Sequence, residues 1–200
     1  MISHKHKFIF IHINKCGGTT IEAVMSKYGG EFIYNRENVW ITKHRKHVLA
    51  RQYSTTQYWK QYFKFSFVRN PWDKECSDYH YHNKGRLSRG EGAYKNLKEY
   101  LQIPQAQPNH DNFYWHSNQL RWLHSSNKKI EIDFIGRFES LQEDFNVACD
   151  KIGIPKQQLP HLNATKHKHY TEYYNDETIE MVAEKYAKDI EYFGYKFGEQ

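Results

Sequence analysis

The sequence predicts an α/β protein with three layers, in which a central parallel sheet lies between helices. Two short apolar runs, Phe8–Ile13 and Phe63–Val68, are each followed by a turn and a helical pattern. A third run, Ile130–Ile135, alternates like a strand and also precedes a helical pattern. Strands that alternate with helices indicate parallel pairing through right-handed crossovers. The length of 200 residues favours one domain, 1–200, with a single core.

The first strand and the helix after it give the clearest pattern. Residues 8–13 read Phe-Ile-Phe-Ile-His-Ile, a nearly continuous apolar run typical of a strand buried on both faces. Residues 14–18, Asn-Lys-Cys-Gly-Gly, form a turn. We expect a helix from Thr19 that ends at Gly29-Gly30. Its apolar face consists of Ile21, Val24, Met25 and Tyr28.

The remaining elements follow from helix-start signals and from periodicity. Between the first two strands we expect irregular structure and a helix around Val48–Tyr58. The segment Asn70–Asp73 starts a helix, because it offers an N-cap Asn, a Pro at the first position and an acid in the first turn. Ser88–His110 is polar and rich in Gly and Pro, which predicts an excursion, and Phe113–His124 looks helical. Two further amphipathic helices are predicted at Ser140–Ile152 and Asp176–Ile190.

The composition bounds the class of partner. The net charge of +6 indicates an anionic partner, and nucleic acid, an acidic glycan and a multiply phosphorylated cofactor all fit. Hydrophobic residues make up 38% of the chain and charged residues 26%, which is polar for a globular protein. The aromatic content of 16% supplies core-forming side chains and argues against disorder.

Cysteine usage and the N-terminal segment bear on the compartment. Cys16, Cys76 and Cys149 are far apart and form no CxxC pattern, so neither a disulfide framework nor a zinc site is expected. The apolar run 8–13 is too short to span a bilayer, and no small-residue cleavage site follows it. We therefore expect a cytoplasmic protein without a membrane span.

The turn after the first strand has the layout of an anion-binding site. Free N–H groups at a helix start, the positive end of the helix dipole and a nearby Lys converge on one phosphate in such sites. The residues here are Lys15, Gly17, Gly18, Thr19 and Thr20. The Walker A pattern is absent because Lys15 precedes the glycines, and GxGxxG is absent too. Taken alone, the glycine pair fits a plain strand-to-helix connection equally well.

A second candidate anion site follows the second strand. Arg69 stands at the carboxyl end of that strand, and Ser77 lies eight residues later, about two turns into the next helix. Ligands of open α/β sheets bind outside the carboxyl ends of the strands. Two adjacent βα units with one anion site each would match a nucleotide that carries phosphates on its 5′ and 3′ positions.

Both sites carry motifs of a known family. Residues 10–22, Phe-Ile-His-Ile-Asn-Lys-Cys-Gly-Gly-Thr-Thr-Ile-Glu, resemble the 5′-phosphosulfate loop of the carbohydrate sulfotransferases. Residues 65–77, Phe-Ser-Phe-Val-Arg-Asn-Pro-Trp-Asp-Lys-Glu-Cys-Ser, resemble their 3′-phosphate-binding motif. The resemblance covers roughly residues 8–197 and is weakest between about 85 and 125. Asn14 stands where the family usually has Pro, and Lys74 replaces the usual Arg, a small change for a surface side chain.

The resemblance implies a P-loop-like fold and an activity. The enzyme would move the sulfuryl group of 3′-phosphoadenosine 5′-phosphosulfate (PAPS) in line to a hydroxyl, chiefly of a carbohydrate, without a metal. Lys15 would contact the 5′-phosphosulfate and offset charge on the leaving oxygen. The other cofactor-binding residues that the resemblance implies are Cys16, Gly17, Gly18, Thr19, Thr20, Arg69, Ser77, Lys166 and Tyr170. A solvated basic loop is the alternative interpretation of Lys166–Tyr170.

The acceptor hydroxyl also needs a general base, and histidine suits neutral pH. The family has a Lys-His pair before the second strand, and Lys46-His47 is the better local match, so His47 is the predicted base. His44 is the alternative, followed by Glu22 or a histidine of the loop at 166–170. The histidine pairs His80/His82 and His167/His169 would share a face only on a strand, and we expect no metal site there.

Two other functions remain for comparison. A P-loop nucleotide kinase or phosphotransferase would need Gly-Lys-Ser/Thr and a magnesium-binding acid at a strand end, and the sequence offers neither. A non-catalytic nucleic-acid-binding domain would fit the positive charge, yet no such motif is evident and the basic residues are spread out. The acceptor, the sulfated position and the oligomeric state stay open. Four residues could line a sugar site or belong to the core: Trp115, Gln119, Arg121 and Trp122.

Overall fold

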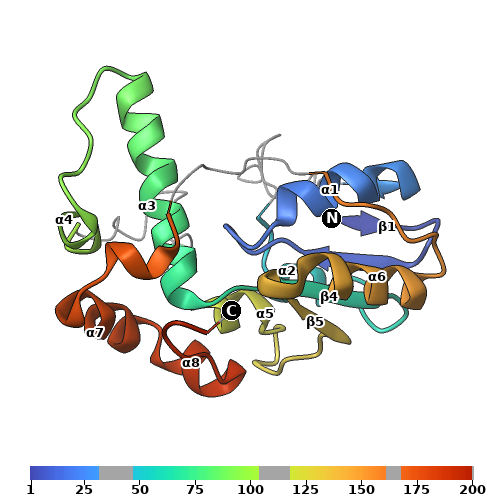
Figure 1. Cartoon of the computed structure of the whole chain (residues 1–200). Coiled ribbons are helices and arrows are strands. Elements are labelled where there is room, and N and C mark those ends of the chain that lie inside the picture. The colour runs from blue at the N-terminus through green and yellow to red at the C-terminus, as the bar shows by residue number, and fades with distance from the viewer. Residues whose placement is uncertain (32–46, 104–117, 161–167, 200) are drawn as a thin grey trace. The chain divides into compact units, whose positions relative to one another are not determined.

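The computed structural model describes residues 1–31, 47–103, 118–160 and 168–199, and it divides into two compact units. The first, here the sheet unit, comprises residues 1–68 and 119–162. The second, here the helical unit, comprises residues 69–118 and 163–200. The chain therefore leaves the sheet unit directly after the second predicted strand, returns to it before the third, and leaves it again after residue 162 (Figure 1).

In the part of the chain that the structure describes, the sheet unit is built on a sheet of five strands in the order β3-β1-β2-β4-β5. Its strands are β1 (Ile2–Ser3), β2 (Phe8–Ile11), β3 (Gly30–Glu31), β4 (Phe63–Val68) and β5 (Phe134–Arg137). The last three in spatial order, β2, β4 and β5, are parallel, with Phe8 opposite Phe63 and Phe65 opposite Phe134. β1 pairs antiparallel with β2 and with β3 at the other edge. The predicted α/β class with a central sheet flanked by helices is confirmed.

Aromatic and branched side chains fill the interior around the parallel strands. Every residue of β2 is buried, as its continuous apolar run predicts. The ring of Phe65 in β4 lies 5.0 Å from that of Phe10 and 5.8 Å from that of Phe8, centroid to centroid. Burial of such rings supplies the dominant favourable free energy of folding. These strands therefore hold their carboxyl ends, where the candidate residues lie, in fixed positions.

Among the described residues of the sheet unit, four α-helices accompany the sheet: α1 (Gly18–Met25), α2 (Ala50–Tyr53), α5 (Gln119–Leu123) and α6 (Leu141–Ile152). Short 3-10 turns extend α1 at Ser26–Tyr28 and precede α6 at Phe138–Ser140. α6 packs against β4 and β5, and α2 packs against α5 (Figure 1). The predicted helix at 140–152 is confirmed, with Phe145 and Ala148 buried.

The helical unit contains α3 (Pro71–Ser88), α4 (Leu97–Leu101), the 3-10 helix η3 (Tyr170–Tyr173), α7 (Asp176–Lys185) and α8 (Ala187–Phe193). α3 packs against α4, α7 and η3. It starts as predicted: the Asn70 side chain caps it by accepting a hydrogen bond from Trp72 N at 3.1 Å, and Pro71 is its first residue. Within the described residues, no helix is long and apolar enough to cross a membrane.

Several boundaries differ from the sequence predictions. The helix expected at 48–58 is a single turn, Ala50–Tyr53, and the third strand starts at Phe134 instead of Ile130. Residues 130–133 do not extend this strand, and Asp133 instead contacts the neighbouring strand β4. The Asp133 carboxylate accepts hydrogen bonds from the backbone amide and from the ammonium of Lys64, both at 2.7 Å. The last helix is interrupted at Tyr186, where φ is −112°. The excursion predicted at 88–110 contains the helix α4, and residues 104–117 lie outside the described residues.

Candidate active site

The loop between β2 and α1 turns through two left-handed residues. Lys15 has φ 64° and Gly17 has φ 77°, and α1 starts at Gly18 with Gly17 as its N-cap. The Gly17 carbonyl accepts hydrogen bonds from the amides of Thr20 at 3.0 Å and Ile21 at 3.3 Å. The amides that come before these in α1 have no carbonyl to bind within a regular helix, so they form the positive end of its dipole.

The positive φ of Gly17 favours glycine at this position, and its surroundings are also close. A Cβ there would lie 2.8 Å from Leu141 Cδ2 at the start of α6. The loop is thus packed tightly on the sheet unit. Lys15 and Thr19 are half-buried and Thr20 is buried. A half-buried ammonium beside a helix N-terminus is a suitable partner for a phosphate or sulfate group.

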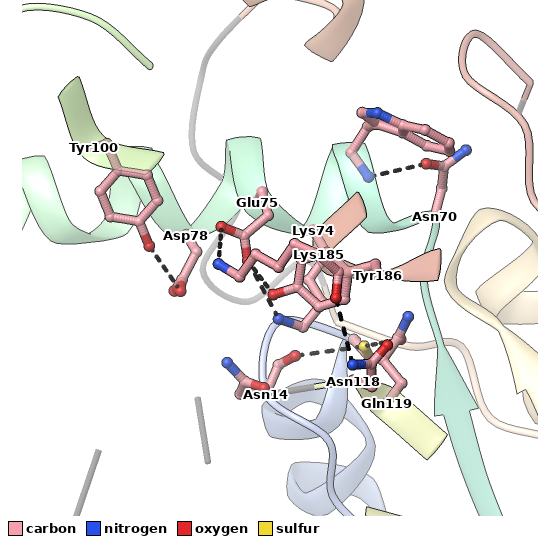
Figure 2. A network of polar contacts seen from close by, with 12 residues as sticks. Asn14, Asn70, Lys74, Glu75, Asp78, Tyr100, Asn118, Gln119, Lys185 and Tyr186 are labelled. Carbon is pink, nitrogen blue, oxygen red and sulfur yellow. Dashed lines mark hydrogen bonds and ion pairs between the residues drawn. The ribbon is translucent and has the colours of Figure 1, made fainter. Parts of the chain in front are cut away.

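The thiol of Cys16 supports this loop from within the protein. It is 1% exposed, and Sγ lies 3.4 Å from Asn14 O and 3.3 Å from Gln119 Oε1 as a weak donor (Figure 2). Gln119 and Trp122 are both buried, so these two are core residues, whereas Arg121 is exposed. The fourth residue of the predicted sugar-lining set, Trp115, lies outside the described residues.

His47, the predicted base, contacts His12, the residue that follows β2. Its Nδ1 lies 3.2 Å from the carbonyl oxygen of His12, and its ring meets the Trp122 ring edge-on at 5.9 Å. A carbonyl only accepts hydrogen bonds, so Nδ1 carries the proton and the lone pair of the neutral ring is on Nε2. This tautomer suits a proton acceptor. The alternative base, His44, lies outside the described residues.

Sequence reasoning overlooked one buried ionisable pair beside the loop. His12 is 3% exposed and Glu22 is 4% exposed, and His12 Nδ1 lies 2.7 Å from Glu22 Oε1. The sequence held a signal: His12 is the single polar residue in the apolar run 8–13. A polar side chain in such a place needs a partner, because burial without one costs free energy.

The residues predicted to bind a 3′-phosphate lie in the helical unit. Arg69 is 8% exposed, and its Nε donates to Asp73 Oδ2 at 2.7 Å, which fixes the guanidinium plane against the first turn of α3. Ser77, two turns along α3, is also 8% exposed. Next to it, burial raises the pKa of the Cys76 thiol to about 12; Asp73 adds to this increase and Arg69 opposes it.

The same helix buries a network of charges (Figure 2). Lys74 and Glu75 are both fully buried, so the Lys that replaces the family's usual Arg is not a surface side chain. Lys74 Nζ lies 3.9 Å from Glu75 Oε1, and Lys185 Nζ lies 3.3 Å from Glu75 Oε2. The Tyr186 hydroxyl donates a short hydrogen bond to Glu75 Oε1. Burial, together with Glu75, raises the pKa of Tyr186 well above its ordinary value.

Of the two cofactor-binding residues predicted in the loop at 166–170, the structure describes one. Lys166 lies outside the described residues. Tyr170 is 4% exposed, its hydroxyl accepts a hydrogen bond from Gly198 N at 2.7 Å, and its ring packs edge-on against Phe197 at 5.6 Å. Its role toward a cofactor stays a prediction. Across the described residues, no group of three or more His, Cys, Asp or Glu side chains has the arrangement of a metal site.

Similarity to known proteins extends over nearly the whole chain. An uncharacterized protein of Archaeoglobus fulgidus is 32% identical over 114 residues, which cover 54% of this chain and 82% of that protein. The crystal structure of mouse sulfotransferase SULT7A1 complexed with PAP matches 92% of this chain and 86% of its own, with a TM-score of 0.54 and 15% identity, which is a likeness of fold. The model of the sulfotransferase family matches residues 1–196. The chain therefore belongs to the sulfotransferase family.

Proposed function

We propose that this protein is a PAPS-dependent sulfotransferase that transfers a sulfuryl group to a hydroxyl of a carbohydrate. The observation that carries the proposal is the loop Lys15–Gly18 at the N-terminus of α1, in a chain that belongs to the sulfotransferase family over 1–196. The fold neighbour SULT7A1 was solved with PAP, the desulfated form of PAPS, which supports the choice of donor. We further propose that both units form one sulfotransferase domain, 1–200.

In this proposal the sheet unit handles the 5′ end of PAPS. The backbone amides and hydroxyls of Cys16–Thr20 bind the 5′-phosphate, with Cys16 acting through its backbone because its thiol faces Asn14 and Gln119. Lys15 contacts the oxygen that bridges phosphorus and sulfur. Negative charge builds on this oxygen as the S–O bond breaks, and the ammonium stabilises it.

The helical unit supplies the partners of the 3′-phosphate. Arg69 and Ser77 bind it, and a guanidinium already oriented by Asp73 offers planar recognition that a lysine would not reproduce. Lys166 and Tyr170 are proposed to cover the nucleotide. The three cysteines are free and buried thiols, which supports a reducing compartment such as the cytoplasm.

His47 is the proposed general base. Its Nε2 accepts the proton of the acceptor hydroxyl while the new S–O bond forms, and the bridging oxygen keeps the electron pair of the bond that breaks. His47→Ala should lower turnover at least about a hundredfold with little change in nucleotide binding. His44→Ala is the matched comparison and should lose much less. A pH–rate profile that is flat from about pH 5 to 8 would count against any histidine in this role.

A binding measurement tests the donor without knowledge of the acceptor. PAP should raise the melting temperature far more than AMP, because AMP lacks the 3′-phosphate; ligand at about 100 times its dissociation constant adds roughly 2.7 kcal/mol. Equal shifts for both nucleotides would contradict the 3′-phosphate assignment. A sulfate-transfer screen with PAPS against sugars, glycolipid head groups and phenols then tests the acceptor class, and turnover on phenols alone would reject a carbohydrate.

A further inference from the structure

The buried pair His12–Glu22 lies in the sheet unit beside two parts of the candidate site, the start of α1 at Gly18 and the proposed base His47. His12 follows β2 directly, and Glu22 is in the second turn of α1. With a carboxylate as the acceptor at 2.7 Å, His12 Nδ1 is the donor of this hydrogen bond. Charge-assisted hydrogen bonds of this length are among the stronger ones, particularly where water is excluded. The orientation of the His12 ring is therefore fixed by α1.

The ring of His12 in turn occupies the space beside the first residue of α1. A Cβ on Gly18 would lie 2.0 Å from His12 Cδ2 and 2.2 Å from His12 Nε2. Such distances exclude any side chain at position 18 while the ring is present. The backbone of Gly18 does not need glycine on conformational grounds, because the positive φ of this loop is at Lys15 and Gly17. Glycine at position 18 therefore leaves the space that the His12 imidazole occupies.

His12 also contacts the proposed base in two ways. Its carbonyl accepts the Nδ1 hydrogen bond that sets the tautomer of His47. Its ring lies 4.3 Å from the His47 ring, centroid to centroid, at an interplanar angle of 58°. One residue thus packs against the start of the phosphate loop's helix and against the proposed base.

We infer that His12, held by Glu22, is a positioning residue for sulfuryl transfer. It sets the place of His47 relative to the first residue of α1. The inference rests on the proposed function, because it gives the pair a role in the same reaction. His12 and Glu22 touch neither donor nor acceptor in this scheme. Their effect should appear in turnover, where the placement of the base counts, rather than in the affinity for PAP, where the loop amides and Lys15 count.

Variants of the pair separate positioning from plain stability. His12→Phe keeps a ring beside Gly18 but loses the bond to Glu22, and kcat should fall about tenfold or more while the dissociation constant of PAP changes less than about threefold. Glu22→Leu should have the same effect. Glu22→Gln keeps an oxygen that accepts the Nδ1 hydrogen bond and should retain most of the turnover. The double variant should be no slower than either single one, because both break one contact.

A second pair of variants tests the contact with Gly18. Gly18→Ala should weaken PAP binding about tenfold or more, because the new methyl group displaces either the ring or the loop. In the His12→Ala background the same change should cost threefold or less, since the ring is gone. Equal losses in both backgrounds would overturn the role of the ring beside Gly18. This pair needs only PAP titrations and remains informative if His12→Phe folds poorly.

His4→Phe is the matched control, since His4 is exposed and its Nδ1 also has one side-chain partner, Tyr62 Oη at 2.9 Å. It should match the wild type in kcat and melting temperature. Wild-type kcat in His12→Phe would overturn the inference, and so would a fall of kcat, PAP affinity and melting temperature together. If the wild-type chain neither binds PAP nor transfers sulfate, the proposed function fails; if it does both and the variants equal it, the inference alone fails.

Discussion

The two units position their candidate anion-binding residues by opposite physical means. The sheet unit uses shape: buried Phe and Ile side chains fix β2, and a loop with two left-handed residues leads into α1. The helical unit uses charge: α3 buries Lys74, Glu75 and Asp78 completely, and Glu75 and Asp78 pair with Lys185 of α7 and Tyr100 of α4. The many polar residues of α3 therefore do not make it a solvent-exposed helix, because several of its charged side chains are buried.

The difference predicts different sensitivities. A loop held by close packing tolerates little added volume, whereas a helix held by buried ion pairs tolerates little change of charge. Removing one member of a buried ion pair is costly because the other member remains without compensation. Substitutions that add volume should therefore be most harmful in the loop of the sheet unit, and substitutions that change a charge should be most harmful in α3.

The largest effect is expected from Glu75→Leu. The variant leaves Lys74 and Lys185 without their carboxylate and Tyr186 without its acceptor, and the free energy of unfolding should fall by about 3–5 kcal/mol. Urea unfolding measures it. The control is Glu177→Leu, which breaks an exposed ion pair with Lys98 and should cost about 1 kcal/mol or less. Similar losses in both variants would show that burial of the charge is not what matters.

Lys15→Ala should lower turnover by roughly a hundredfold, on the order of 3 kcal/mol, and weaken PAP binding far less. In the proposed mechanism, its ammonium is most effective when the leaving oxygen becomes anionic. Steady-state kinetics with PAPS, next to PAP titrations, provide the two numbers. Lys7→Ala is the control, because Lys7 is an exposed lysine of the same unit with a similar φ of 51°. An unchanged kcat with a raised KM would make Lys15 a binding residue only.

Arg69→Ala should remove the preference for PAP over AMP without unfolding the helical unit. The lost hydrogen bonds to a charged phosphate amount to about 1.5–3 kcal/mol, roughly ten- to a hundredfold in PAP affinity. Calorimetric titration with each nucleotide measures this, and AMP affinity should hardly change. Arg86→Ala, at the far end of the same helix, should keep the preference. A variant of Arg69 that still prefers PAP would remove this residue from the 3′-phosphate site.

The smallest effect concerns alkaline pH. Burial raises the pKa of Cys76 from 9.0 to about 12, so the folded protein keeps this proton where the unfolded chain loses it. The resulting stability is fully present below about pH 9 and declines as the pH rises toward 12. The melting temperature of Cys76→Ala should therefore fall less steeply between about pH 9 and 11 than that of the wild type. Parallel slopes would contradict the burial of this thiol.

Sequence patterns predicted those strands and helices whose formation depends on residues close together in the chain. The apolar run from Phe63 to Val68 is a strand with those bounds, and the Asn-Pro start of α3 and the amphipathic α6 lie where expected. Periodicity and capping depend on neighbours in the chain, so a sequence contains them. The two-residue strands β1 and β3 were not predictable, because their pairing depends on β2 and on each other instead of on an internal pattern.

Long-range pairing limited the prediction of the site. The loop residues and Arg69 were proposed from motifs, and their roles stay predictions. The His12–Glu22 pair was missed although its members are only ten residues apart, because a contact between the end of a strand and a helix has no periodic pattern. The burial of Lys74 was missed because it depends on distant segments. A charged residue on a helix is usually exposed, and only the meeting of α3 with Tyr186 and Lys185 makes burial of Lys74 and Glu75 favourable. Contacts between segments more than a hundred residues apart leave no periodic trace in the sequence.

The left-handed backbone at Lys15 has a consequence for engineering. A lysine with φ 64° adopts a conformation that costs an L-residue about 1–2 kcal/mol and that glycine reaches freely. Heat resistance and the proposed catalytic role of Lys15 therefore favour different residues at this position. A directed-evolution campaign that screens survivors of heating, without an activity step, should collect glycine or asparagine at position 15 early and return a library of sturdy, inert proteins.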